Sequence, residues 1–215
     1  MYKRQESTRP GHVQITDQEE IDRVAPIIEA VKARFDVPVS LDTYKSAVAE
    51  AGIAVGADLI NDIWGLKYDP KMADVIAKAD VACCLMHNRD NSDYGDFLSE
   101  WYQETAECVE LAKKAGIADD KIILDPGVGF GKTYEQNLTT IKYMDDLKKL
   151  GYPLLLGTSR KSVIGLTLDT PVTDRAVGTA VTTVFAVQQG YAFVRVHDIK
   201  VNKQAIQMTK AILNA

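Results

Sequence analysis

Three polar side chains follow short apolar runs of the kind that form buried strands. They are Asp42, Asn61 and Asp125. A carboxylate accepts paired N–H bonds and an amide both donates and accepts, so the three could hold a flat heterocycle with an amino-pyrimidinone edge. The alternative is that each one caps the helix that follows it. Three such residues at successive strand ends favour a ligand site.

The segment Asp125–Thr133 is rich in glycine and follows directly on the third of these strands. It is not a phosphate-binding P-loop, because Pro126 occupies the place of the first glycine. It is not a dinucleotide fingerprint either, because Lys132 stands where the third glycine belongs. Glycines let a backbone approach a ligand closely, and Phe130 could lie against an aromatic ring. We interpret the segment as a ligand loop.

Two cationic segments follow later strands. Ser159-Arg160-Lys161-Ser162 supplies a lysine that could donate to a carbonyl or ring nitrogen, although a solvated basic loop is the common alternative. Arg195 and His197 are two residues apart, so in a strand their side chains fall on one side and could clamp a diphosphate. The alternative for His197 is a partly buried, hydrogen-bonded histidine. His87 has the same two interpretations.

Helical and strand patterns alternate along the chain, which predicts an α/β fold. Thr16 and the acids after it mark a helix start. The strands are short and apolar throughout, as in a parallel sheet covered on both faces. The expected strands are Val37–Leu41, Ala57–Ile60, Val81–Met86, Ile122–Leu124, Pro153–Leu156 and Tyr191–Val196. The helices expected between and after them are Lys45–Val55, Pro70–Ala79, Tyr94–Ala115, Glu135–Leu150, Arg175–Gln189 and Asn202–Leu213.

Composition limits the classes of protein to which the chain can belong. A net charge of −5 without a long basic block argues against nucleic acid or a membrane as partner. Cys83 and Cys84 lie in an apolar run and are expected to be reduced core residues. No segment has the pattern of a membrane span or a signal peptide, and no residue spacing suggests a zinc site. We expect one cytoplasmic domain over residues 1–215.

Taken together and in order, the motifs resemble dihydropteroate synthase, a family of pterin-binding (β/α)8 barrels. In such a barrel the strand C-termini converge on one face and carry the active site. The matching segments are Glu6–Gly11, Leu41–Lys45, Asn61–Ile63, Leu85–His87, Asp125–Thr133, Gly157–Ser162 and Arg195–Asp198. The resemblance implies a transferase of folate biosynthesis, which joins 6-hydroxymethyl-7,8-dihydropterin diphosphate to para-aminobenzoate and releases diphosphate.

The resemblance also implies a role for each matching residue. Lys161, Arg195 and His197 would act in catalysis, and the last two would take the diphosphate with Thr8 and Arg9. Pro10, Lys161 and Ser162 would border the para-aminobenzoate site, which sulfonamides occupy as mimics. The family uses Mg²⁺ and suggests a homodimer through its late helices. The pterin would be held by Asp42, Asn61, Asp125 and Lys161, with Gly157 beside it and with Met86 and Phe130 lining its slot.

The front of the chain departs from the family. Two βα units of the barrel are not matched, and neither is the Asn that helps to hold Mg²⁺, so no metal ligand is expected among these residues. Met1–Gln5 resembles the translated end of a sequencing transposon, which predicts a non-native start and a clipped gene. A barrel without two strands exposes unpaired sheet edges, so we expect poor solubility and little activity.

Two other functions fit parts of the pattern. Corrinoid-linked methyltransferases use a similar pterin-binding barrel, but methyl transfer needs no diphosphate clamp such as Arg195 and His197. A non-catalytic pterin-binding remnant would keep the ligand residues and lack the metal-binding segment. Binding of pterin without turnover would distinguish that remnant from the enzyme.

Overall fold

A computed structural model describes residues 14–215, and the expected non-native start lies outside them. The described residues form two compact units. Unit 1 holds residues 14–87 and Thr105–Ile123, and unit 2 holds Asn88–Glu104 and Leu124–Ala215. The long helix α4 (Phe97–Lys114) and the strand β4 (Ile122–Asp125) each contribute residues to both units. A single domain over residues 1–215 stays a prediction.

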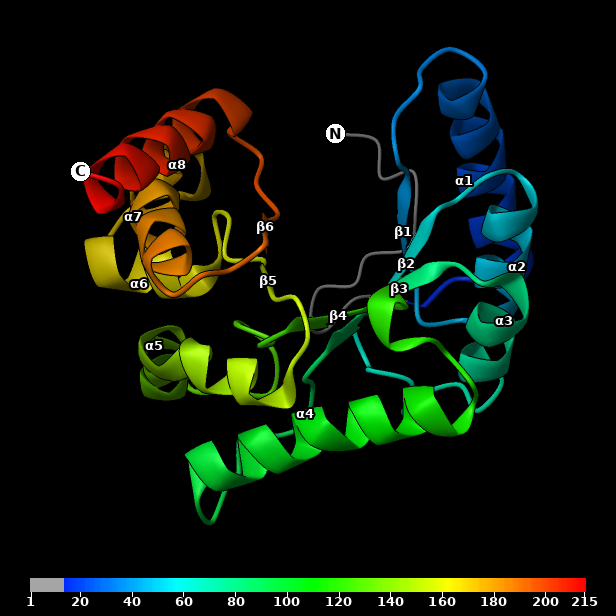
Figure 1. Cartoon of the computed structure of the whole chain (residues 1–215), viewed down its shortest axis with the longest axis horizontal. Helices are drawn as coiled ribbons and strands as arrows, with labels where there is room; N and C mark the ends of the chain where they lie inside the picture. The colour runs from blue at the N-terminus through cyan, green and yellow to red at the C-terminus, as the bar shows by residue number, and fades with distance from the viewer. Residues whose placement is uncertain (1–13) are drawn as a thin grey trace. The chain divides into compact units, whose positions relative to one another are not determined.

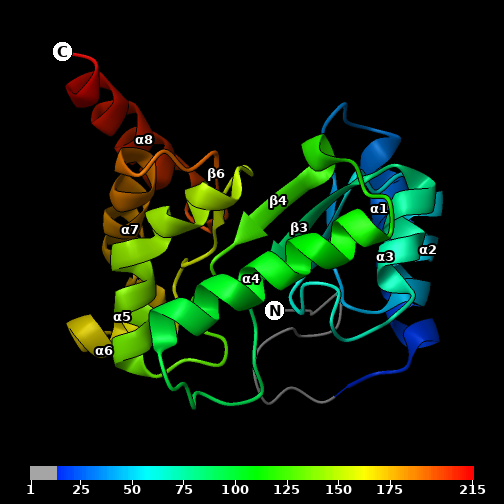
Figure 2. The ribbon, with the colours of Figure 1, turned by 60° about the horizontal axis from the view of Figure 1, so that its bottom comes forward.

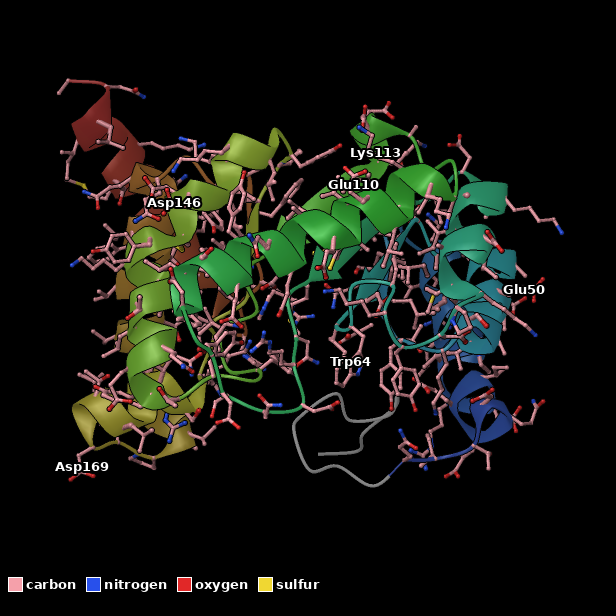
Figure 3. All side chains as sticks on the ribbon, turned by 90° about the horizontal axis from the view of Figure 1, so that it is seen from below. Glu50, Trp64, Glu110, Lys113, Asp146 and Asp169 are labelled. Atoms are coloured by element: carbon pink, nitrogen blue, oxygen red, sulfur yellow. The ribbon has the colours of Figure 1, made fainter. Side chains whose placement is uncertain are left out.

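Unit 1 alternates helices and strands. Figure 1 shows α1, α2 and α3 along one side of the strands, as expected for a parallel sheet with helical crossovers. The labelled Glu50 on α2 and Glu110 and Lys113 on α4 are exposed (Figure 3). The elements are α1 (Asp17–Lys32), β1 (Ser40–Asp42), α2 (Ser46–Ala54), β2 (Leu59–Asp62), α3 (Met72–Ala79), β3 (Ala82–Met86) and a 3₁₀ turn, η1 (Asp119–Lys121).

The expected start of the first helix is confirmed. Thr16 is the N-cap of α1, and its hydroxyl oxygen accepts a hydrogen bond from the Glu19 N–H at 3.2 Å. Asp17, Glu19 and Glu20 lie in the first turn, where negative charge interacts favourably with the helix dipole. The cap and the acids fix where the chain enters the helix.

The strands of unit 1 pair in parallel in the order β1-β2-β3, with β4 next in the sheet. Asp42 on β1 lies opposite Asn61 on β2, and Asn61 lies opposite Cys84 on β3. Cys83, Cys84 and Leu85 are fully buried, so the expectation of core cysteines is confirmed. The register therefore places two of the expected site residues side by side.

Unit 2 contains the remaining elements. β5 pairs with β6 in parallel, and a parallel bridge between Leu124 and Leu154 joins β4 to the chain leading into β5. Helices α7 and α8 pack against each other (Figure 2). The elements are α5 (Tyr134–Tyr143), the 3₁₀ helix η2 (Met144–Leu150), β5 (Leu155–Leu156), α6 (Ser162–Leu168), the 3₁₀ turn η3 (Val172–Asp174), α7 (Ala176–Gln188), β6 (Phe193–Val194) and α8 (Ile199–Leu213).

Several of the expected elements have different bounds in the structure, and two of the strands differ most. The strand expected from Val37 begins at Ser40, because Pro38 offers no N–H to a sheet and Val37 is exposed. The strand expected over Tyr191–Val196 keeps only Phe193–Val194, so Arg195 and His197 follow the strand rather than lying in it. The shared-side argument from strand periodicity is therefore wrong for this pair.

The helix expected over Glu135–Leu150 is two elements. After Tyr143 the chain tightens into η2, where Met144 and Leu147 are three residues apart and both fully buried. Side chains at that spacing eclipse each other in a 3₁₀ helix, so the tighter winding turns both toward the core. Six strands occur among residues 14–215, in the order and number expected, and all observed pairings are parallel. Within the described part, no helix is long and apolar enough to span a membrane.

Candidate active site

In unit 1 the expected site residues lie at the ends of strands: Asp42 and Met86 are the last residues of β1 and β3, and Asn61 is the last but one of β2. The Asn61 side-chain N–H donates to Asp42 Oδ1 at 3.0 Å, and Asn61 is almost fully buried. The bond fixes the amide orientation, because its nitrogen faces the carboxylate and its oxygen is directed elsewhere. Met86 ends β3, His87 follows it, and both are buried. One of the two interpretations of His87 from the sequence was a partly buried, hydrogen-bonded histidine. The structure buries it almost fully.

Asp62, next to Asn61, has a structural role. Its Oδ1 accepts from the Trp64 N–H and its Oδ2 from the Leu66 N–H, each at 2.8 Å. The carboxylate thereby organises the turn that carries Trp64, labelled in Figure 3. Burial raises the pKa of Asp62 to about 6, against the lowering effect of the two hydrogen bonds. The alternative to a ligand site was that such an acid caps the next helix. Asp62 accepts from backbone N–H groups in the same way, but those groups belong to a turn and not to a helix.

In unit 2 the glycine segment is a loop folded around its own polar groups. Asp125 is buried, and its Oδ1 accepts from the Gly127 N–H at 2.8 Å. Gly127, Gly129 and Gly131 have φ of 72°, 87° and 53°, in the left-handed region that glycine adopts without steric cost. The backbone therefore turns tightly after Asp125 and brings Phe130 into the interior.

Two lysines lie against this loop. Lys161 Nζ donates to the Val128 carbonyl and lies 4.7 Å from the centre of the Phe130 ring, a cation–π arrangement. Lys132 Nζ donates to the carbonyls of Gly127 and Phe130, at 3.0 Å each. Enclosure of this amine, helped by the positive charge of Lys161, lowers the pKa of Lys132 to about 7. The solvated-loop alternative for Lys161 is therefore wrong.

The ends of β4, β5 and β6 converge at Gly157. A methyl group placed on Gly157 would lie 3.2 Å from Asp125 Oδ2 and 3.7 Å from both Nε and Nη2 of Arg195. A carboxylate and a guanidinium thus both lie close to the position that a side chain of this buried glycine would occupy. Arg195 is exposed at this edge, and its backbone N–H donates to the Leu156 carbonyl at 2.9 Å. The structure thus places Asp125, Gly157 and Arg195 close together, and their roles in binding stay predictions.

His197 is exposed and held by Ser159. The Ser159 Oγ accepts from the His197 backbone N–H at 3.1 Å and lies 2.9 Å from Nδ1 of the ring. Arg160 and Asp198 form a bidentate ion pair, with Nε–Oδ2 of 3.0 Å and Nη2–Oδ1 of 2.6 Å. These two contacts fasten the segment Arg195–Asp198 to the segment Ser159–Ser162, which we call the SRKS loop.

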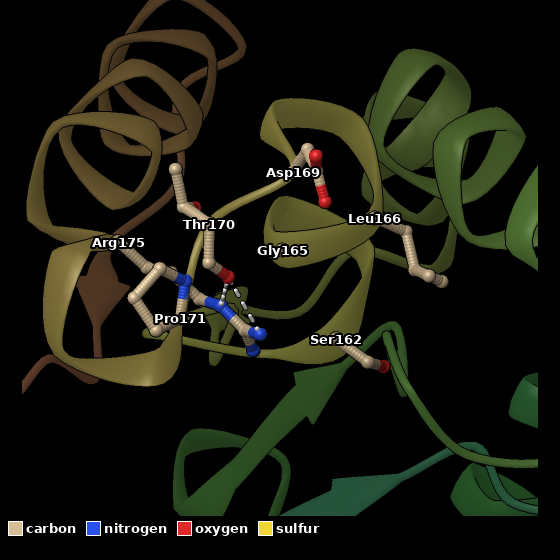
Figure 4. Close-up of a pocket in the computed structure, with 7 residues that line it drawn as sticks. All are labelled: Ser162, Gly165, Leu166, Asp169, Thr170, Pro171 and Arg175. Atoms are coloured by element: carbon tan, nitrogen blue, oxygen red, sulfur yellow. Dashed lines mark hydrogen bonds between the residues drawn. The ribbon is translucent and has the colours of Figure 1, made fainter.

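The expected site residues are therefore divided in three. Asp42, Asn61 and Met86 belong to unit 1, and Thr8, Arg9 and Pro10 lie outside the described residues. Ser162 begins α6 and is exposed beside a hollow that it lines with Leu166 and Arg175 (Figure 4). The remaining members, all in unit 2, are Asp125, Phe130, Gly157, Lys161, Ser162, Arg195 and His197.

Sequence reasoning missed the supports of the glycine loop. The Tyr94 hydroxyl donates to the Gly131 carbonyl at 2.9 Å, and Arg89, paired with Glu100 and Glu104, packs its backbone against Gly131. Asn137 accepts from the Gly129 N–H and donates to the Thr133 carbonyl at 2.7 Å. The only signal in the sequence was the four-residue spacing of Glu100 and Glu104 on one helix face.

Among residues 14–215, no group of three or more His, Cys, Asp or Glu side chains is placed to hold a metal ion. The magnesium ion that the resemblance implies stays a prediction.

Comparisons with known proteins agree with the motifs. The family model of pterin binding enzymes matches residues 5–197. A dihydropteroate synthase of Clostridium beijerinckii is 55% identical over 209 residues, covering 97% of this chain and 78% of the relative. That of Bacillus subtilis is 46% identical, covering 97% and 73%. Both identities extend over nearly the whole chain.

Solved structures give the same result for the fold. The dihydropteroate synthase of Clostridium difficile, crystallised in the presence of pteroic acid, has a TM-score of 0.94 and 47% identity, covering 96% of this chain and 79% of its own. The Yersinia pestis enzyme with a sulfonamide drug complex has a TM-score of 0.93 and 38% identity, covering 98% and 78%. The Xanthomonas albilineans enzyme with 4-aminobenzoic acid has a TM-score of 0.93 and 35% sequence identity. That match covers 98% of this chain and 77% of the Xanthomonas chain.

The fold, an α/β barrel of the type seen in these enzymes, is confirmed in its parallel strands and surrounding helices. The expected function of a dihydropteroate synthase and the expected class of enzyme, a transferase of folate biosynthesis, are confirmed as well. These relatives disfavour the corrinoid-linked alternative. By family model, sequence identity and structure, the chain belongs to the dihydropteroate synthase family of pterin-binding enzymes.

Proposed function

We propose, from the resemblance to the family, that residues at the strand ends of the two units hold the two substrates of dihydropteroate synthesis. The pterin of 6-hydroxymethyl-7,8-dihydropterin diphosphate is held by Asp42, Asn61, Asp125 and Lys161. The carboxylates accept from its amino and ring N–H groups, and Lys161 donates to its carbonyl or ring nitrogen. The observation that carries the proposal is the convergence of Asp125 and Arg195 around Gly157. It offers an acceptor for the pterin next to a cation for the diphosphate.

Phe130 and Met86 line the flat pterin slot in this proposal, and Gly157 lets the ligand approach. Gly157 supports the latter role, because a side chain there would fill the space between Asp125 and Arg195. Phe130 is buried under Lys161, which holds the ring in one orientation. A fixed aromatic face suits stacking on a heterocycle.

Arg195 and His197 take the diphosphate. Both are exposed, and the backbone N–H groups of Arg195 and His197 donate to the Leu156 carbonyl and to Ser159 Oγ, so the segment that carries the two side chains is fixed at the strand ends. Thr8 and Arg9, outside the described residues, complete the anion site by resemblance. Arginine offers paired donors to phosphate oxygens, which is the reason for preferring it here.

Para-aminobenzoate binds beside Lys161, Ser162 and Pro10. Ser162 is exposed at the start of α6, where a hydroxyl can donate to a carboxylate. The relatives crystallised with 4-aminobenzoic acid and with a sulfonamide drug complex support both the substrate and sulfonamides as its mimics in this chain. Small molecules, rather than nucleic acid or membrane, are its proposed partners.

The reaction breaks one C–O bond and forms one C–N bond. Diphosphate leaves with the electron pair of the C–O bond, and the resulting cation is stabilised by the electron-rich pterin. The neutral aniline nitrogen attacks that carbon and then loses a proton to solvent. Arg195 and His197 stabilise the departing charge, while Lys161 and Asp125 orient the pterin. No strong general base is needed, because the aniline nitrogen has a free electron pair before attack.

Four further parts of the expectation remain proposals. The 215 residues correspond to six of the eight βα units of the barrel, in keeping with the 73–79% of the relatives that they cover. Mg²⁺ accompanies the diphosphate through a ligand outside the described residues. The enzyme works in the cytoplasm. A homodimer forms through α7 and α8, whose exposed apolar side chains support it: Val177, Val181, Phe185, Met208 and Ile212.

Turnover of pterin diphosphate with para-aminobenzoate and Mg²⁺ tests the proposal. The 215-residue chain is compared with the same chain preceded by a family-like front segment, and Asp125→Asn and Arg195→Met are made in the more active form. We expect only the extended form to turn over, and both variants to lose at least about a hundredfold in kcat/KM. Equal turnover by the short chain would refute the account of the front units and the metal. Pterin binding without turnover by either form would support the non-catalytic remnant.

A further inference from the structure

We infer that Arg175 is a positioning residue that holds the SRKS loop and thereby fixes Lys161 for catalysis. The inference rests on the proposed role of Lys161. The Arg175 guanidinium lies at the start of α7, where Nη1 donates to the carbonyls of Arg160 at 3.1 Å and Lys161 at 3.3 Å. Nε and Nη2 donate to the Thr170 carbonyl at 3.1 and 3.0 Å (Figure 4). One planar group thus ties two segments of backbone together.

The SRKS loop needs such a tie because of its backbone conformation. Arg160 has φ of 58°, in the left-handed region that a residue with a side chain seldom adopts. Its N–H donates to Thr179 Oγ1 at 3.1 Å and its carbonyl accepts from Arg175. Both backbone polar groups of Arg160, the N–H and the carbonyl, are therefore hydrogen-bonded to side chains at the start of α7. Surrounding contacts of this kind are what keep an unfavourable conformation populated.

Lys161, the next residue, depends on that conformation. Its carbonyl is the second acceptor of Arg175, while its side chain turns toward the glycine loop, to the Val128 carbonyl and the Phe130 ring. If the loop relaxed, the ammonium group would leave the ring that is proposed to stack on the pterin. The hydrogen bonds that Arg175 makes to Arg160, Lys161 and Thr170 all go to backbone carbonyls, so we infer that it acts on catalysis through Lys161.

Gly165 makes room for the guanidinium. A Cβ on Gly165 would lie 2.1 Å from Nη2, 2.2 Å from Cζ and 2.5 Å from Nε of Arg175. A free arginine end would move aside at little cost, but this one can only move by breaking its hydrogen bonds to the three carbonyls. Gly165 lies inside α6, where alanine would otherwise be the better helix former. A glycine at this position is explained by the close approach of Arg175.

This geometry makes the effect of Gly165→Ala depend on Arg175. We propose a cycle of Gly165→Ala, Arg175→Ala and the double variant, in the form of the chain that turns over, with Arg23→Ala on the exposed face of α1 as control. Tm is measured first, and kcat and KM for both substrates well below it. With Arg175 present, Gly165→Ala should lower Tm and reduce kcat/KM for the pterin diphosphate about tenfold or more. Arg175→Ala should give the same loss, and Arg23→Ala none.

In the Arg175→Ala background the same Gly165→Ala substitution should raise Tm, because alanine now fits and favours the helix. It should leave kcat/KM at the value of Arg175→Ala. Additive losses in the double variant, or unchanged kinetic constants in Arg175→Ala at a temperature where it is folded, would overturn the inference. A role in stability alone would move Tm and leave both kinetic constants of the folded enzyme unchanged.

Lys161→Met separates this inference from the proposed function. If Lys161→Met loses pterin affinity while Arg175→Ala keeps the wild-type constants, the inference fails and the role of Lys161 stands. If Lys161→Met is itself without effect, the proposed role of Lys161 fails and the inference fails with it. Losses in both, with Arg175→Ala no worse than Lys161→Met, support the inference.

Discussion

Replacing Asp62 by Asn should change how stability depends on pH. Asp62 is almost fully buried in unit 1, and burial raises its pKa from 3.8 to about 6. A carboxyl group with a higher pKa in the folded chain than in the unfolded chain opposes folding as pH rises, because unfolding lets it release its proton. The wild type should therefore lose stability between these two pKa values, and Asp62→Asn should not.

The size of the effect follows from the two pKa values. A difference of about 2 pKa units corresponds to about 3 kcal/mol in the free energy of unfolding, at about 1.4 kcal/mol per unit. About 2 kcal/mol of this should be lost between about pH 4.5 and pH 7, since part of the loss occurs below that range. The amide also gives up one of the two hydrogen bonds, to Trp64 or to Leu66. That cost is the same at every pH and cancels from the comparison.

Urea unfolding followed by circular dichroism measures the effect, at several pH values for both proteins. The free energy of unfolding of the wild type minus that of Asp62→Asn should fall by about 2 kcal/mol over that pH range. Asp58→Asn is the control, because Lys32 and the Val39 N–H hold the pKa of Asp58 below its usual value. Its difference from the wild type should stay constant over the same range. A constant difference for Asp62→Asn as well would show that burial does not perturb this carboxyl group.

Two further variants test the supports of the unit 2 site. Asn137→Ala removes the acceptor of the Gly129 N–H and the donor to the Thr133 carbonyl, so urea unfolding should show a loss of about 2 kcal/mol, while Asn214→Ala at the exposed end of α8 shows none. Asp198→Asn breaks the bidentate pair with Arg160. Its kcat/KM should fall by the same factor at about pH 6 and about pH 8, because Arg160 keeps the pKa of Asp198 below its usual value and the pair ionised throughout. An effect of Asp198→Asn at only one of these pH values would contradict that assignment.

The sequence was sufficient to locate the strands and the residues at their ends. Short apolar runs followed by Asp42, Asn61 and Asp125 placed all three correctly, although each proves to be in the strand rather than after it. The observed strand bounds differ from the expected ones because backbone pairing with the neighbouring strand, and not the run of apolar residues, decides where a strand begins and ends. Asp42 pairs with Asn61 in the parallel register although both are polar.

Helix α6 could not be predicted from local propensity. Its residues include Val163, Ile164 and Gly165, which are poor helix formers. Val163 and Ile164 are buried with Val128, Met144 and Leu156 in the core of unit 2, and this packing favours the helix more than propensity opposes it. The contacts of Ser159 with His197 and of Arg160 with Asp198 were equally inaccessible, because each joins residues 38 positions apart.

Helix α7 shows why the ordinary rule of amphipathic helices would misplace this site. Its apolar Val177, 73% exposed, and Val181 face outward, while Thr179, Thr182 and Thr183 are buried. The buried hydroxyls bond to the Arg160 N–H, to Thr158 and to Asn202, which in turn donates to the Asp198 carbonyl.

Each of these inward contacts of α7 ends on the SRKS loop, on the residue before it, or at Asp198 and the helix that follows it. The polar face of α7 is therefore the buried one, because its threonine hydroxyls supply hydrogen-bond donors and acceptors at fixed positions to the loops that carry charged side chains. The apolar side chains are left on the opposite face, and their exposure is a consequence of that arrangement. If α7 lies at a dimer interface, as proposed, then the helix that one protomer presents to the other is also the helix that fixes the catalytic loops. Substitution of Val177 or Val181 by a charged residue should then alter both oligomeric state and KM.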